Sequence, residues 1–187
     1  MSRNAPLARM PVQMVTIEGN IGAGKTTVAR HITSYMPDTK FFPAPGRSKN
    51  PHWQAFHENP QAHGFVMQTW FLRERLRVYI EALHHMDQAR ESVVLDFSVF
   101  SDEIFATAHY EHGYMTDTEF ETYKELTRSI FALKLPPPHL TIVLHADPKV
   151  CLERSAGLER FSASACSGRV CLSARLSVSA EIGRAHV

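Results

Sequence analysis

The stretch VQMVTIEGNIGAGKTT, residues 12–27, decides the fold of this 187-residue chain. Its first seven residues form a short apolar run that ends at a glycine, which is typical of a buried parallel strand. The pattern G-x-x-x-x-G-K-[ST] follows at once, through Gly19, Gly24, Lys25 and Thr26. A helical stretch then begins at Lys25. A strand, a glycine-rich loop and a helix in this order predict a phosphate-binding loop.

The chemistry of this loop suits a nucleoside triphosphate. Glycines let the backbone turn tightly, so that several N–H groups and the N-terminus of the helix face one phosphate. We expect Lys25 to reach the β- and γ-phosphates, and Thr26 and Asp96 to bind Mg²⁺. Lys25 and Asp96 are therefore the candidate catalytic residues. The candidate phosphate-binding residues of the loop are Gly19, Asn20, Ile21, Gly22, Ala23, Gly24, Lys25, Thr26 and Thr27.

Further along the chain, strands alternate with helices. Apolar runs at residues 39–42, 92–96 and 140–145 predict three more strands, and a loop rich in Pro, Gly and Ser is expected at 43–51. Helices are expected from Lys25 to about Met36, at 60–90, at 101–111, from a capping box at 116–119 to about Leu133, and from residue 147. This alternation predicts an α/β fold, the three-layer P-loop fold in which helices flank a parallel sheet, here ending before the last strand.

Charge and cysteine content limit the possible partners and compartments. Twenty Lys and Arg balance nineteen Asp and Glu, so we expect neither a nucleic-acid polymer nor a membrane as partner. Three cysteines, an odd number that all lie late in the chain, indicate a reducing compartment. We therefore expect a cytoplasmic protein. The leader, residues 1–11, has two arginines and no acidic residue, which leaves a mitochondrial location as the weaker alternative.

The loop and three later motifs narrow the function. GNIGAGKTT, NPHWQAFHENPQAHGFVMQTWFLRERL, DFSVFSDEIFA and HADPKVCLER occur in that order. Together they resemble the deoxyribonucleoside kinase family, over about residues 12 to 160. The resemblance implies ATP- and Mg²⁺-dependent phosphorylation of the 5′-hydroxyl of a deoxyribonucleoside. It also implies a homodimer, since members of this family commonly dimerise through helices beside the sheet.

The resemblance also assigns substrate-binding residues. Gln68 is similar to the glutamine that hydrogen-bonds the nucleobase, and a carboxamide offers the base both a donor and an acceptor. Arg75 and Asp102 match the arginine and the aspartate beside the base. Met67 and Trp53 are expected to line the pocket. Without the resemblance, these polar residues would be read as surface positions. Two further matches are lid arginines that close over the triphosphate, Arg154 and Arg160.

At two positions the chain departs from the family pattern. The loop after the second strand normally reads Pro-Glu-Pro, with the glutamate accepting the proton of the 5′-hydroxyl, but here Ala44 stands in that place. The third strand normally ends in Glu/Asp-Arg-Ser, but Phe97 replaces the arginine. Asp96 is a candidate to accept the proton instead, and Arg47 is a candidate to supply the missing positive charge.

The domain prediction is a leader at 1–11, the kinase-like domain at 12–160 and an atypical tail at 161–187. The tail alternates apolar and polar residues from Val170 to Ala180, which favours an edge strand. Its last seven residues, EIGRAHV, are what a common sequencing-adapter sequence encodes. We expect residues 181–187 to be adapter read-through, and the natural chain to be longer.

Two other functions remain open at this point. A nucleoside monophosphate kinase shares the loop and the lid, and Arg47, Arg73 and Arg75 are the arginines that it would use to clamp the acceptor's phosphate. A catalytically impaired nucleotide-binding or scaffold protein on the same fold is the other alternative. Ala44 and Phe97 favour that alternative, and the intact phosphate loop argues against it.

Overall fold

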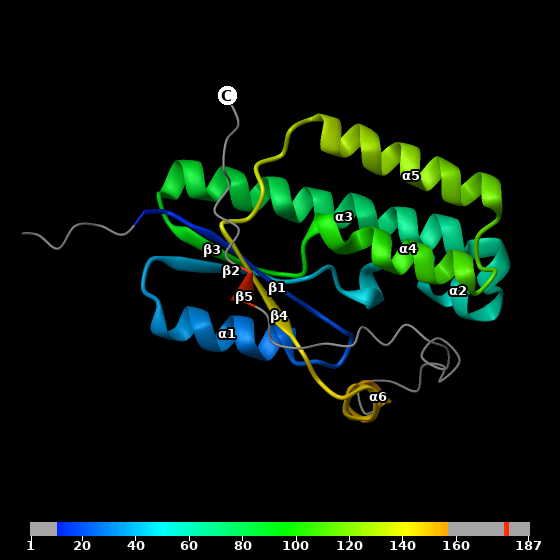
Figure 1. Ribbon diagram of the computed structural model, residues 1–187, viewed down its shortest axis with the longest axis horizontal. Helices are drawn as coiled ribbons and strands as arrows, with labels where there is room; N and C mark the ends of the chain where they lie inside the picture. The colour runs from blue at the N-terminus through cyan, green and yellow to red at the C-terminus, as the bar shows by residue number, and fades with distance from the viewer. Residues whose placement is uncertain (1–10, 157–177, 180–187) are drawn as a thin grey trace, which may run out of the picture.

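A central sheet organises the computed structural model, which describes residues 11–156 and 178–179 (Figure 1). The strand order is β2-β3-β1-β4-β5. The strands are β1 (Met14–Gly19), β2 (Thr39–Phe42), β3 (Ser92–Asp96), β4 (Leu140–Leu144) and β5 (Val178–Ser179). The first four pair in parallel, as predicted, and β5 pairs antiparallel with the edge of β4. Of the edge strand expected within 170–180, only these two residues lie in the described part of the chain.

The helices agree closely with the sequence prediction, with one exception. They are α1 (Lys25–Tyr35), α2 (Trp53–Glu58), α3 (Pro60–Ala89), α4 (Asp102–Glu111), α5 (Asp117–Ala132) and α6 (Pro148–Ala156). Short 3₁₀ turns lie at Arg47–Lys49 and Val99–Ser101. The exception is α2, for which the sequence analysis made no prediction, because it has only six residues and carries no clear helix signal.

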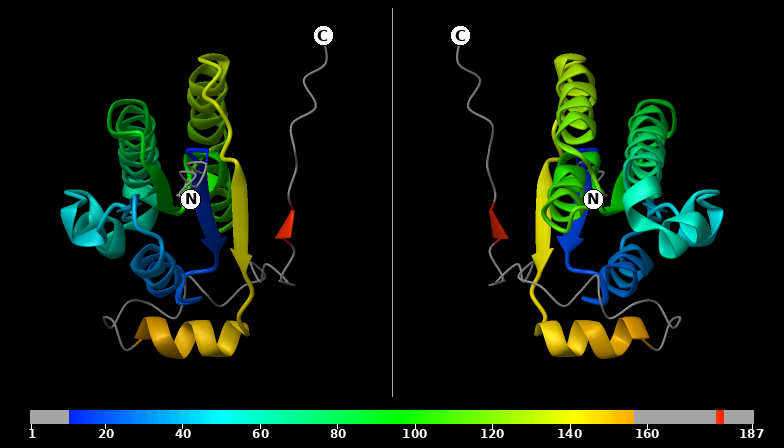
Figure 2. Two further views of the ribbon diagram at one scale, coloured as in Figure 1. Left: turned by 90° about the vertical axis from the view of Figure 1, so that its left-hand side faces the viewer. Right: turned by 90° about the vertical axis from the view of Figure 1, so that its right-hand side faces the viewer.

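Side-chain alternation along the strands builds two separate cores, one on each face of the sheet. On β3, Val93 and Leu95 pack into the cluster that contains α3 residues such as Tyr79. Val94, between them, packs against Ala29 of α1 on the opposite face. Edge-on views show α1 on one side of the sheet and α3, α4 and α5 on the other (Figure 2). The three-layer prediction is therefore confirmed.

Local signals at the helix ends act as the sequence predicts. At the start of α5, the Thr116 hydroxyl accepts a hydrogen bond from the Glu119 N–H at 3.3 Å, and the Glu119 carboxylate accepts one from the Thr116 N–H at 2.8 Å. This reciprocal pair is the expected capping box. On α3, the apolar side chain of Ile80 is 48% exposed.

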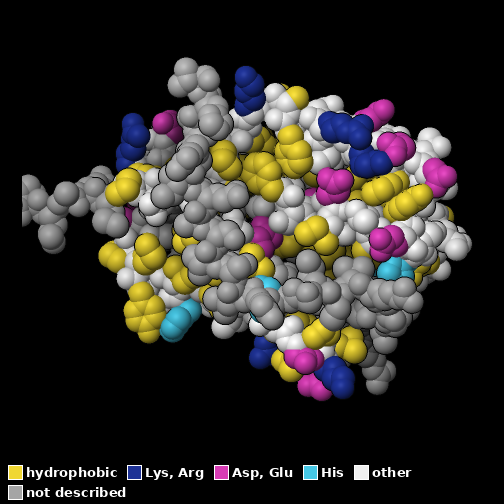
Figure 3. Space-filling model, viewed as in Figure 1, with side chains coloured by type: hydrophobic (Ala, Val, Ile, Leu, Met, Phe, Trp, Pro, Cys, Tyr) yellow, Lys and Arg dark blue, Asp and Glu magenta, His cyan; other side chains and the backbone are white. Residues whose placement is uncertain are grey.

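The described surface is mixed in character. On the face shown in Figure 3, acidic and basic side chains are interspersed along α5 rather than grouped by sign. Among the helices in the described part of the chain, none has the length and apolar character needed to span a membrane.

Candidate active site

The phosphate loop connects the carboxyl end of β1 to α1, as the sequence predicts. The Ala23 N–H donates to the Asn20 carbonyl at 3.1 Å and closes a tight turn. Gly22 has a φ of 80°, and a Cβ there would lie 2.3 Å from the Cys151 carbonyl of α6. Gly24, with a φ of 98°, stands directly before the first residue of α1. Only glycine fits these two positions, because one has no room for a side chain and both need a left-handed backbone.

Lys25 already points into this loop. Its Nζ donates to the Gly19 carbonyl at 2.9 Å and to the Asn20 carbonyl at 2.8 Å. Burial lowers the pKa of the Lys25 ammonium, and attraction to Asp96 and Glu18 opposes that shift. A lysine beside the N-terminus of a helix is suited to bind phosphate.

Thr26 and Asp96 meet across two elements. The Thr26 hydroxyl, in the first turn of α1, donates to Oδ2 of Asp96 at the end of β3. A hydroxyl and a carboxylate are hard oxygen donors, which fits Mg²⁺ when substrate phosphates complete the coordination. Among the described residues no group of three or more His, Cys, Asp or Glu side chains could hold a metal by itself. The donor set therefore fits a magnesium ion that arrives with a nucleotide.

A buried polar network gathers the three predicted base-reading residues. Asp102, fully buried at the start of α4, forms an ion pair with Arg75. The Gln68 amide donates to Oδ2 of Asp102 at 3.0 Å, and the Tyr123 hydroxyl on α5 donates to the same oxygen. Burial lowers the pKa of the Arg75 guanidinium to about 10, so it remains charged at neutral pH. The expectation that these residues would lie on the surface without the resemblance is wrong, because they are buried and pair with one another in the interior.

The two remaining substrate candidates lie in a neighbouring aromatic cluster. Met67 is 2% exposed and packs with Phe56 and Phe71. The Trp53 ring meets the Phe71 ring edge-on at 6.2 Å. The Arg75 guanidinium lies 5.3 Å from the centre of the Phe71 ring. Phe71 therefore joins this aromatic cluster to the polar network.

Phe97 lies between the phosphate loop and the polar network. Its ring centre is 5.7 Å from the Lys25 Nζ and 4.8 Å from the Arg75 guanidinium. The ring of Phe105 packs against it at 5.2 Å. The backbone of Phe97 has a φ of 71°, which is uncommon for a bulky residue and costs free energy. One strained residue therefore contacts the cations of both halves of the site.

A family comparison matches this arrangement. A model described as deoxynucleoside kinase matches residues 15–162, which is most of the chain. The chain belongs to the deoxynucleoside kinase family. The resemblance stated from the sequence motifs is thereby confirmed.

Relatives within and around this family differ in their named roles. Deoxyguanosine kinase of Dictyostelium discoideum is 32% identical over 79% of this chain and 51% of its own length. A subunit of NADH dehydrogenase from Rattus norvegicus, 1 alpha subcomplex subunit 10, is 28% identical over 71% of this chain and 42% of its own length. The chain thus spans about half the length of the curated relatives it matches. A solved deoxyadenosine kinase from M. mycoides shares the fold, with a TM-score of 0.62 at 22% identity over 80% of this chain and 72% of that one.

The departures from the family pattern are visible in the structure. Ala44 follows β2 with no group that could accept a proton, and Phe97 holds the arginine position. Arg47, the candidate for the missing charge, places its guanidinium 5.7 Å from the Trp53 ring centre, and its charge contributes to the lowered pKa of Lys25. Arg154 on α6 reaches to 4.0 Å of the place where a Gly24 side chain would begin. Arg160 lies outside the described residues, as does the predicted tail apart from Val178–Ser179.

Sequence reasoning missed two buried polar residues of the site. Tyr123 looks like an ordinary inward position of an amphipathic helix, although a buried tyrosine hydroxyl usually has a polar partner. Glu18 ends an apolar run and is 7% exposed. Its position directly before the phosphate loop is the signal that could have drawn attention to it.

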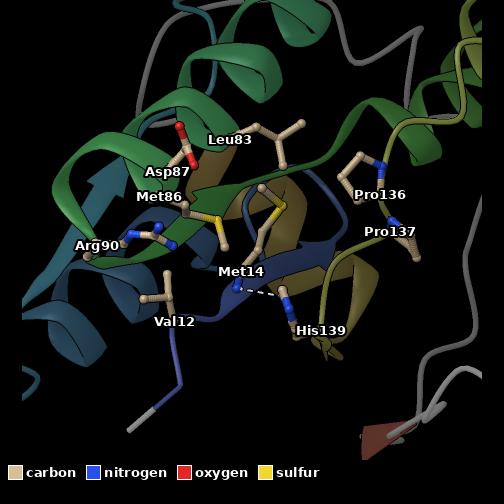
Figure 4. A pocket seen from close by; sticks show the side chains of 9 residues that line it. All are labelled: Val12, Met14, Leu83, Met86, Asp87, Arg90, Pro136, Pro137 and His139. Atoms are coloured by element: carbon tan, nitrogen blue, oxygen red, sulfur yellow. Dashed lines mark hydrogen bonds between the residues drawn. The ribbon is translucent and has the colours of Figure 1, made fainter. Parts of the chain in front are cut away.

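A cavity of about 270 Å³ lies at the other end of the sheet (Figure 4). It is lined by Met14 at the start of β1, Val12 just before that strand, the last turns of α3 and the segment before β4. The His139 Nδ1 there accepts a hydrogen bond from the Met14 N–H at 3.0 Å. In parallel α/β sheets, ligands bind beyond the carboxyl ends of the strands. This cavity lies at the amino ends, so we do not assign it to the active site.

Proposed function

We propose that this chain transfers the γ-phosphate of ATP to the 5′-hydroxyl of a deoxyribonucleoside. The observation that carries the proposal is the position of Phe97, whose ring touches the cation of the phosphate loop and the cation of the polar network. A donor phosphate beside Lys25 and an acceptor beside Arg75 would therefore both lie next to this ring.

The phosphate loop and its neighbours would bind ATP and Mg²⁺. The loop N–H groups and Lys25 would hold the ATP phosphates, with Arg154 above the loop as a further cation. Magnesium bound at Thr26 and Asp96 would neutralise charge that builds up on the phosphates during transfer. Phosphoryl transfer depends mainly on positioning and electrostatic stabilisation, and these residues supply both.

The polar network would recognise the nucleobase. In it, Asp102 fixes the Gln68 amide and the Arg75 guanidinium in one orientation, and rigid polar groups discriminate well between bases. Met67 and Trp53 would line the apolar side of the same pocket. The relatives support a nucleoside as the substrate, since they include deoxyguanosine and deoxyadenosine kinases and one solved structure with dCMP bound.

The test is phosphorylation of the four deoxynucleosides and of their 5′-monophosphates with ATP and Mg²⁺, followed by chromatography of the products. We expect monophosphate product from at least one deoxynucleoside, and none with Lys25→Ala. Diphosphate product from the monophosphates alone would instead favour a nucleoside monophosphate kinase. Glu111→Gln, an exposed change at the far end of α4, is the matched control and should retain the native rate.

A second candidate function is that of a nucleotide-binding protein without turnover. Phe97 favours it, because an apolar ring occupies the position where the family pattern has a charge-stabilising arginine, and such a group typically contributes a factor of about 10²–10³ to the rate. A relative that is named as a subunit of NADH dehydrogenase shows that a similar chain can bear another role. Calorimetric binding of ATP and of a deoxynucleoside, with no product over hours, would support this candidate.

A further inference from the structure

Two carboxylates stand at the carboxyl ends of neighbouring strands, and they face opposite sides of the sheet. Asp96, at the end of β3, lies on the same face of the sheet as Val94, which packs on α1. There its carboxylate accepts a hydrogen bond from the Thr26 hydroxyl. Glu18, near the end of β1, lies on the same face of the sheet as Met14, which packs against residues of α3. Because side chains alternate along a strand, Asp96 belongs to the metal side and Glu18 to the side of the nucleoside network.

The surroundings of Glu18 leave one oxygen free. Its Oε1 accepts a hydrogen bond from the Ser98 N–H at 3.0 Å. Its Oε2 is buried and makes no hydrogen bond to any residue that the structure describes. Buried polar atoms in folded proteins nearly always have a partner, so an exception at a functional site points to a ligand. A glutamine would bind Ser98 equally well, so this contact does not explain why the residue is acidic.

The charged groups that act on Glu18 come from both halves of the site. Lys25 of α1 and Arg75 of α3 both interact electrostatically with its carboxylate, and the Ser98 and Ser101 hydroxyls stabilise its charge. Burial outweighs these effects and raises the pKa of Glu18 above its ordinary value. A carboxylate with a raised pKa is a better proton acceptor than an exposed one.

We propose that Glu18 is the proton acceptor of the transfer reaction, in place of the glutamate that Ala44 lacks. This inference rests on the proposed function. As the 5′-oxygen bonds to the γ-phosphorus, the bond from that phosphorus to the bridging oxygen of ADP breaks. The hydroxyl proton passes to Oε2 of Glu18 and leaves to solvent after the products dissociate. Asp96 is less suited, because its Oδ2 already accepts the Thr26 hydroxyl on the other face of the sheet.

The decisive variant is Glu18→Gln, which keeps an acceptor for the Ser98 N–H but takes up no proton. We expect kcat to fall by about 10²–10⁴, with the KM values for ATP and the deoxynucleoside little changed. In the native chain, kcat/KM should fall with unit slope as pH drops below the raised pKa of Glu18. In Glu18→Gln this acidic limb should be absent. Glu111→Gln should retain both the rate and the limb.

A second variant covers the case in which Glu18→Gln does not fold, which thermal unfolding would reveal. Glu18→Asp keeps the carboxylate but withdraws it by one methylene, and a displacement of about 1 Å can cost a factor of about 10². We expect a lower kcat with the acidic limb retained.

The possible outcomes separate this inference from the proposed function. Native turnover together with an unchanged rate or an unchanged acidic limb in Glu18→Gln, or an unchanged rate in Glu18→Asp, would overturn the role of Glu18 and leave the kinase function standing. A native chain that binds ATP and a deoxynucleoside without turnover would overturn both.

Discussion

The buried Arg75–Asp102 ion pair allows a quantitative prediction of the free energy of unfolding that does not depend on catalysis. The Asp102 side chain is 0% exposed and that of Arg75 is 12% exposed. Asp102→Asn removes the charge without changing the shape, and it leaves the buried Arg75 cation without its ion-pair partner. Removing one partner of a buried pair typically costs about 3–5 kcal/mol. For a chain of this size, that corresponds to a fall in Tm of about 10 °C.

Arg75→Met should cost less than Asp102→Asn. The remaining carboxylate still accepts hydrogen bonds from the Gln68 amide and the Tyr123 hydroxyl. We therefore expect Arg75→Met to lower the free energy of unfolding by about 3 kcal/mol. The double variant leaves no uncompensated charge. It should therefore be more stable than the sum of the single effects predicts, by about 1–3 kcal/mol.

Urea unfolding at neutral pH, followed by circular dichroism, measures all three variants on one scale. The slopes against urea concentration should agree among them, so that the differences report stability alone. Glu111→Gln is the matched control and should lie within about 0.5 kcal/mol of the native chain. Single effects that add up in the double variant within about 0.5 kcal/mol would show that the two side chains do not stabilise each other, contrary to this prediction.

Three further predictions concern other parts of the molecule. Gly64→Ala should destabilise by about 1–3 kcal/mol in urea unfolding, because a Cβ there would lie 2.1 Å from the Tyr114 carbonyl; a stabilised variant would contradict this packing. Burial lowers the pKa of His109 from 6.5 to about 4. As the pH drops from 6.5 to 4, His109 therefore takes up a proton in the unfolded chain before it does so in the folded chain, and the free energy of unfolding should fall by up to about 1.4 kcal/mol per pH unit. His109→Phe should flatten that decline, and an unchanged pH dependence would rule His109 out as its cause. Ala44→Glu should change kcat by less than about threefold if Glu18 already accepts the proton, whereas a gain of about 10² would mean that no acceptor was in place.

Much of the fold could be predicted because its signals are local. The phosphate loop, the capping box of Thr116 and Glu119, and the apolar run of β3 each depend on residues adjacent in sequence. Helix α2 has no such signal, since it is short and lies between Pro51 and Asn59. Its apolar side packs on α3 through Phe56 and Met67, a tertiary contact that local patterns do not reveal.

The site was predictable only in part, for a similar physical reason. The pairing of Thr26 with Asp96 follows from parallel strands that end at one edge of the sheet. The burial of Asp102 depends instead on partners from three places along the chain, among them Tyr123. Glu18 was missed because a continuous apolar run does not show which face of the sheet its last residue takes.

The most direct test of the proposed phosphate transfer follows the γ-phosphate of ATP. The full chain is mixed with ATP labelled in its γ-phosphate, Mg²⁺ and either a 2′-deoxynucleoside or its 2′,5′-dideoxy analogue, and the nucleoside is then examined by mass spectrometry. We expect one labelled phosphate on the 2′-deoxynucleoside, none on the analogue that lacks the 5′-hydroxyl, and none with Lys25→Ala. If ATP binds but no nucleoside gains a phosphate, the loop holds phosphate without passing it on, and the proposed transfer is wrong.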